Sequence, residues 1–71
     1  MTLQEVKMNM NRMVRFRGGE YKLIGCMFRQ NEKSGEFYYQ AELLDLKNGR
    51  SVVICKLEEV EEKNNERNEE S

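Results

Sequence analysis

Hydrophobic and polar residues alternate over residues 37–43, and this period of two predicts a β-strand with one face toward a core. Residues 51–57, SVVICKL, predict a second strand because they are rich in β-branched side chains. The polar residues 47–49, KNG, separate the two stretches and indicate a turn. The pattern therefore predicts a β-hairpin whose loop length decides which side chains meet.

Two loop lengths give two different registers for this hairpin. A two-residue loop at Asn48 and Gly49 would place Lys56 opposite Ala41 on the core side, which makes a poor core. A three-residue loop with Gly49 in the left-handed conformation instead pairs apolar residues on one face: Leu43 with Val53, Ala41 with Cys55 and Tyr39 with Leu57. We predict the register of the three-residue loop.

Another turn signal extends the sheet toward the amino terminus. Residues 13–17 alternate as a short strand, and Gly18-Gly19 indicates a tight two-residue turn because both glycines accept positive φ. This turn would pair Phe16 with Tyr21 and Val14 with Leu23. Residues 21–30 are then predicted to form a long strand, in which Gly25 indicates a bend or a bulge.

The polar stretch 31–35, NEKSG, predicts a five-residue loop that pairs Met27 with Tyr39, Gly25 with Ala41 and Leu23 with Leu43. The three turns agree on one inner face, and this agreement supports the assignment. The predicted inner residues are Val14, Phe16, Tyr21, Leu23, Met27, Phe37, Tyr39, Ala41, Leu43, Val53, Cys55 and Leu57. The predicted fold is all-β or mainly β: a small antiparallel meander of four or five strands curled into a barrel.

The two ends of the chain differ from this middle part, and we expect a single β domain over residues 13–62. Residues 2–5, TLQE, fit a helix capping box, and apolar residues at 3, 6, 10 and 13 have helical spacing. The leader 1–12 is therefore either a short amphipathic helix or a flexible segment with alternative methionine starts. Val60 is expected to anchor a short last strand or a 3₁₀ turn. Residues 63–71 contain no apolar side chain, and we expect a disordered acidic tail.

Composition excludes several classes of protein. The 71 residues allow one domain with a modest core, and they include two cysteines and no histidine, too few ligands for a structural zinc site. The predicted registers place Cys55 inside and Cys26 on the opposite face, so we expect free thiols in a reducing compartment. No stretch approaches the about 20 apolar residues of a membrane span, and no signal-peptide core is visible. We expect a cytoplasmic protein.

Candidate chemistry is sparse. The chain has no glycine-rich phosphate loop, no nucleophile elbow and no cysteine beside a recognisable base, so we expect neither an enzyme nor a cofactor. Net charge is −1, but residues 1–57 carry ten Lys or Arg against six Asp or Glu, whereas residues 58–71 carry two against seven. This mildly basic domain permits contact with nucleic acid without requiring it.

The order of these parts resembles small barrels of the Src-homology-3 or Tudor type: a short strand, a Gly-Gly hairpin, a long strand carrying glycine, two paired strands and a turn before the terminal LEEV. The segments VRFRGGEYKLIG and FYYQAELLDLKNGRSVVICKLEEVE also resemble short uncharacterised proteins of bacterial mobile elements. The resemblance covers residues 13–62. The chain has no Trp for a polyproline-binding surface, and the only candidates for an aromatic cage are Phe28, Phe37, Tyr38 and Tyr39. The resemblance therefore implies a fold and transfers no activity.

The same registers predict a second apolar face. They place Ile24, Cys26, Phe28, Tyr38, Leu44, Val52 and Ile54 on the side opposite the core. An apolar face of this extent usually has a cover or a partner. Three explanations remain for what lies on this second face. The sheet closes into a barrel at Gly25 or the leader packs on it, a second copy of the chain packs on it in a homodimer, or a different partner binds it.

Two functional hypotheses follow. The first is a non-catalytic binding module that acts through a protein–protein interface, as a homodimer or with another protein, formed by Ile24, Phe28, Tyr38, Leu44, Val52 and Ile54. The second is binding of nucleic acid. In this hypothesis Phe28 and Tyr38 stack on bases, and the residues that contact phosphates are Arg15, Arg17, Lys22, Arg29 and Lys33. Lys and Arg on strands also keep a monomer soluble without any ligand.

Overall fold

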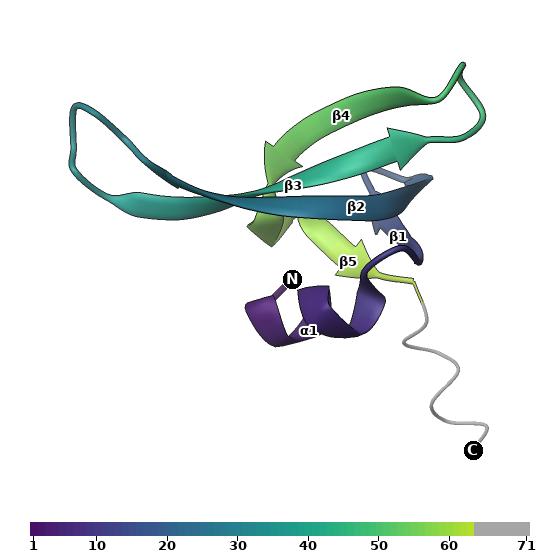
Figure 1. The fold of residues 1–71 in the computed structure, drawn as a ribbon, viewed down its shortest axis with the longest axis horizontal. Coiled ribbons are helices and arrows are strands. Elements are labelled where there is room, and N and C mark those ends of the chain that lie inside the picture. Colours follow the sequence, from purple (N-terminus) through teal and green to yellow (C-terminus); the bar gives the residue numbers. More distant parts are fainter. Residues whose placement is uncertain (64–71) are drawn as a thin grey trace.

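The computed structural model describes residues 1–63, which form a short helix and one antiparallel sheet of five strands (Figure 1). The elements are α1 Leu3–Asn9, β1 Met13–Phe16, β2 Gly19–Gln30, β3 Phe37–Asp45, β4 Ser51–Lys56, the 3₁₀ turn η1 Leu57–Glu59, and β5 Val60–Glu62. The predicted mainly β antiparallel meander is confirmed. Of the tail expected at 63–71, residues 64–71 lie outside the described residues.

The sheet formed by residues 1–63 is open. Its strand order is β4-β3-β2-β1-β5, so that β4 and β5 are the two edges. Strands β2 and β3 extend together well beyond the other strands as a long hairpin (Figure 1). The fold therefore has one long free-standing end and one end covered by α1.

The register of β3 and β4 is as predicted. Leu43 lies opposite Val53, and Ala41 lies opposite Cys55. Pairing ends at Asp45 and Ser51, so the loop has five unpaired residues, 46–50, with Gly49 at φ 71° and Arg50 at φ 61°. The predicted pair of Tyr39 with Leu57 does not form within the described sheet, because the chain turns into η1 at Leu57.

The first hairpin is shifted by two residues from the prediction. Arg17 and Gly18 form its turn with φ 51° and 80°, and Phe16 lies opposite Gly19 while Val14 lies opposite Tyr21. A tight hairpin turn needs two residues with positive φ, and Arg17 supplies one of them in place of Gly19. A shift of two residues preserves the faces of both strands, so the inner residues stay inside.

A β-bulge in β2 corrects the prediction for the second hairpin. The predicted pair of Leu23 with Leu43 forms, but Ile24 is an extra residue, and Gly25 then lies opposite Glu42. Every later residue of β2 is displaced by one and changes face. Cys26 and Phe28, predicted outside, lie on the inner face, whereas Met27 is outside.

Gly25 lies beneath the Glu42 side chain at this bulge. A Cβ on Gly25 would overlap the Glu42 carboxylate oxygen Oε1, so a larger residue there would displace the end of the Glu42 side chain. The sequence indicated a bend or a bulge at Gly25, and the pairing of β2 with β3 shows a bulge at the preceding residue, Ile24.

The core lies between α1 and the inner face of the sheet. The buried cluster comprises Val6, Val14, Phe16, Leu23, Ala41, Leu43, Cys55, Leu57 and Val60. Val60 is 1% exposed and anchors β5, as predicted. Because Val6 of α1 belongs to this cluster, the helix covers the inner face, and the alternative in which the leader packs on the outer face is wrong.

Helix α1 begins at a capping box and is fixed by a buried amide. Thr2 Oγ1 accepts from the Glu5 N–H at 3.1 Å, and Glu5 Oε1 accepts from the Thr2 N–H at 2.9 Å. Asn9 is 4% exposed, and its Nδ2 donates to Glu5 O at 2.7 Å and to Glu62 Oε2 at 2.8 Å. A helix of seven residues is too short to be stable alone, so these contacts with the sheet hold it.

Asn9→Ala should destabilise the protein by about 1–2 kcal/mol, because it removes the two hydrogen bonds that the buried Asn9 amide donates to half-buried partners, Glu5 O and Glu62 Oε2. A domain of this size should then unfold some 4–16 °C lower. Thermal unfolding followed by circular dichroism checks this, with Gln4→Ala on the exposed side of α1 as the control. Equal melting temperatures for the two variants would contradict the role given to Asn9.

Candidate functional site

Three aromatic rings stand exposed at the far end of the β2–β3 hairpin. Phe28 and Phe37 are 59% and 61% exposed, and Tyr39 is 36% exposed. The rings of Phe28 and Phe37 are stacked with centroids 4.9 Å apart, and Tyr39 lies 5.0 Å from Phe28 at an interplanar angle of 40°. We call these three residues the aromatic shelf. The shelf continues the inner face of the sheet beyond the part that α1 covers.

The shelf borders a free strand edge. Within residues 1–63, β4 pairs only with the part of β3 from Gln40 to Asp45, so residues 37–39 pair with β2 alone. Successive residues of a strand turn their backbone groups to opposite sides. The backbone N–H and C=O groups that point to the free edge therefore belong either to Tyr38 or to its two neighbours, Phe37 and Tyr39.

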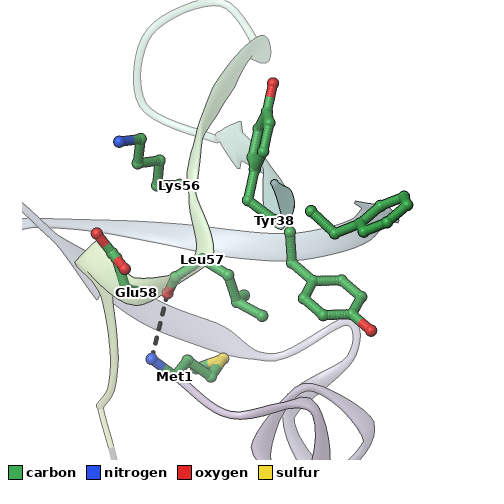
Figure 2. A pocket seen from close by; sticks show the side chains of 7 residues that line it. Met1, Tyr38, Lys56, Leu57 and Glu58 are labelled. Atoms are coloured by element: carbon green, nitrogen blue, oxygen red, sulfur yellow. Dashed lines mark hydrogen bonds between the residues drawn. The ribbon is translucent and has the colours of Figure 1, made fainter. Parts of the chain in front are cut away.

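A shallow cavity of about 260 Å³ opens at this edge (Figure 2). It is lined by Met1, Phe37, Tyr38, Tyr39, Lys56, Leu57 and Glu58. The Met1 amino group donates to Leu57 O at 3.2 Å and holds Met1 beside the cavity (Figure 2). A second cavity of about 430 Å³ shares Phe37, Tyr38, Lys56 and Glu58 with the first. Together they form a groove whose charged side chains are Lys56, Glu36 and Glu58.

Sequence reasoning placed Phe37 and Tyr39 in the core and missed this shelf. Phe37 and Tyr39 alternate with polar residues, as the buried residues of a strand do. Burial also requires a strand or helix that packs over them. The strand lengths carried a signal: in the predicted register, β4 would need to run past Leu57 to reach Phe37. The acidic pair that follows Leu57, Glu58 and Glu59, belongs to η1 instead.

The outer face carries a second apolar surface. Val52 and Ile54 are 53% and 44% exposed on β4, and Leu44 beside them on β3 is 9% exposed. Ile24, the bulge residue next to Gly25, is 36% exposed. We call Ile24, Leu44, Val52 and Ile54 the aliphatic strip. Four of the six residues predicted as an interface thus lie on one face.

The other two predicted interface residues are separated from the strip and from each other. Phe28 lies on the inner face in the shelf, because the bulge reverses that part of β2. Tyr38 lies on the outer side and lines the groove. These two rings face opposite sides of the sheet, so they cannot both stack on one nucleic-acid strand as the second hypothesis expected.

The five basic residues of that hypothesis do not form one patch. Arg15 lies between Glu20 on β2 and Glu61 on β5. Arg17 forms an ion pair with Glu59 at 3.5 Å, and its guanidinium lies 5.1 Å from the centre of the Phe16 ring. Lys22 lies opposite Leu44, whereas Arg29 and Lys33 belong to the far hairpin, which also carries Glu32 and Glu36. Acidic neighbours therefore offset the basic charge at both ends of the sheet.

The two thiols lie on the same inner face, on either side of Ala41, and not on opposite faces as predicted. They are free, as expected. Strand β3 lies between them, so two strand spacings, about 10 Å in all, separate them, which is too far for a disulfide. Burial raises the pKa of both thiols. For Cys55, Glu59 raises the pKa further and Arg17 lowers it. Neither thiol has the depressed pKa of a nucleophile.

Within the part of the chain that the structure describes, no group of three or more Cys, Asp or Glu side chains is placed to hold a metal ion. No helix among residues 1–63 is long and apolar enough to cross a membrane. Comparison of the chain with protein-family models, curated proteins and solved structures finds no match. The shelf, the groove and the strip are therefore the features of the described chain that bear on its function.

Alkylation rates should follow the charges around Cys55. Iodoacetamide reacts with the thiolate, so both thiols should react more slowly in the folded protein than in urea. Glu59→Gln should lower the pKa of Cys55 and speed its alkylation at neutral pH, whereas Arg17→Gln should raise the pKa and slow it. Mass spectrometry of the labelled peptides measures both rates, and Cys26, whose pKa is raised by burial alone, is the internal control. An identical Cys55 rate in both variants would contradict this electrostatic explanation.

Proposed function

We propose that this protein is a non-catalytic binding module whose aromatic shelf and groove receive an extended segment of another protein. The observation that carries the proposal is the free edge of β3 at residues 37–39, which lies directly beside three exposed rings. An exposed strand edge binds an extended peptide through its backbone, and neighbouring pockets select its side chains. This site supplies both parts.

The geometry specifies the kind of segment that fits. A strand added at residues 37–39 would continue the line of β4, since both lie along the same edge of β3. Its alternate side chains would then point to opposite faces. One set would contact Phe37 and Tyr39, which favours aromatic or aliphatic residues. The other set would lie near Tyr38 and Lys56, which favours polar or acidic residues.

The distribution of charge favours a protein segment over nucleic acid. Single-strand binders combine stacking rings with a continuous basic groove. Here the groove contains Glu36 and Glu58 beside Lys56, and the stacked faces of Phe28 and Phe37 already cover each other. Arg15 and Arg17, which the nucleic-acid hypothesis requires, lie near the opposite end of the sheet beside acidic residues.

We also propose that the sheet is of the SH3-like small-barrel class, as the sequence resemblance implies. The strand order, the bulge in the long second strand and the 3₁₀ turn before the last strand support this assignment. A bacterial mobile element and a cytoplasmic location belong to the same proposal and rest on the sequence alone.

Phe37→Ala and Tyr39→Ala should each weaken peptide binding at least tenfold, because aromatic anchors dominate such interfaces. Peptides selected from a random linear library on the wild-type protein provide the probes, and fluorescence polarisation gives their dissociation constants. Selected sequences should alternate apolar and polar residues. Met8→Ala is the matched control, since Met8 on α1 is 61% exposed, the same fraction as Phe37, but lies outside the groove.

Two results would overturn the proposal. One is a library that yields no binder, or binders equally affected by Met8→Ala. The other is tight binding of single-stranded oligonucleotides that weakens steeply between low and high salt, which is the signature of phosphate contacts and would support the nucleic-acid alternative.

A further inference from the structure

Strand β4 is an edge strand without the usual protection. Edge strands of monomers commonly carry inward charges, proline or bulges that block pairing with another chain. The sequence of β4, SVVICK, has no proline, and its single charged residue stands at the end. Along residues 51–55, β4 pairs with β3 on one side in regular register and has no partner strand among residues 1–63 on the other.

We infer that two copies of this chain pair through their β4 strands, antiparallel and about a two-fold axis at Val53. The five-stranded sheets then join into one sheet of ten strands. This interface is separate from the groove, so the inference does not depend on the proposed function.

Symmetry and side-chain chemistry together select Val53 as the axis. A two-fold axis perpendicular to the sheet keeps each face on its own side, so residues that face each other must belong to the same face. An axis at Val53 places Val52 opposite Ile54 of the second copy, and Ile54 opposite Val52. An axis at Ile54 would place Val52 opposite Lys56, and an axis at Cys55 would place Ile54 opposite Lys56. Of these three arrangements, only the axis at Val53 gives both Val52 and Ile54 an apolar partner. Lys56, the remaining residue on the outer face of β4, then lies beyond the five paired residues, opposite Arg50 of the loop.

The aliphatic strip supplies the apolar contact. Val52 and Ile54 are 53% and 44% exposed, and the axis at Val53 brings both against their counterparts while the backbone edges pair. The net charge of −1 gives almost no repulsion between copies. Pairing of five residues per chain is a small interface, so we expect a concentration-dependent dimer rather than an obligate one.

A cysteine placed on the axis tests the register directly. Across an antiparallel pair, facing Cα atoms lie about 4.5–5.5 Å apart, which is within disulfide range. Val53→Cys should therefore form a covalent dimer under mild oxidation. Ile54→Cys and the native Cys55 should not, because each then lies about 8 Å or more from its counterpart. Non-reducing electrophoresis and intact-mass measurement give the yields.

Light scattering over a range of concentrations tests the association itself. The wild type should shift from monomer toward dimer, and Ile54→Lys should stay monomeric with an unchanged circular dichroism spectrum. Leu46→Lys is the matched control, because Leu46 is 43% exposed against 44% for Ile54 but lies in the loop beyond β4. A wild type that remains monomeric at several hundred micromolar, or a disulfide that forms at Ile54→Cys in preference to Val53→Cys, would overturn the inference.

Discussion

One extra residue in β2 decides what this protein presents on each face. The bulge at Ile24 shifts the β2–β3 register by one, and every side chain from Gly25 onward changes side. Phe28 thereby joins Phe37 and Tyr39 in the aromatic shelf, and Cys26 joins the edge of the core. The bulge also leaves the aliphatic strip free of aromatic rings. The two apolar surfaces therefore differ in chemistry, and each suits a different kind of contact.

The sequence predicted the strand register correctly where only one register pairs apolar side chains on the core face. In the β3–β4 hairpin, Ala41 meets Cys55 in one register and Lys56 in the other, so the apolar register was predicted correctly. In β2, Met27 and Phe28 are both apolar, and either one fits opposite Tyr39. Hydrophobic pattern cannot distinguish these two registers. Gly25 indicates a bulge nearby, but the hydrophobic pattern does not record that Ile24 is the extra residue.

The candidate site was predicted only in part for a related reason. Alternation shows which residues share a face, but not whether another element covers them. The register predicted Val52 and Ile54 on the face opposite the core, where a cover was expected, and within the described chain they are exposed. Phe37 and Tyr39 were predicted as buried, and they are exposed because β4 ends at Lys56, before it reaches them. The end of a strand depends on where the chain leaves the sheet, and Leu57 continues the apolar pattern after the chain has turned.

The contacts that close the core join the two ends of the described chain. Asn9 of α1 bonds to Glu62, and β1 pairs with β5 across more than 40 residues of sequence. The central hairpins involve neighbours in sequence and can form early, whereas contacts between distant residues form late. During synthesis, β1 can pair with β2 as soon as residue 30 has left the ribosome, but Asn9 and the second edge of β1 have no partner until residues 60–62 have left it. We therefore expect the helix to be the last part of the nascent chain to become protected from proteases.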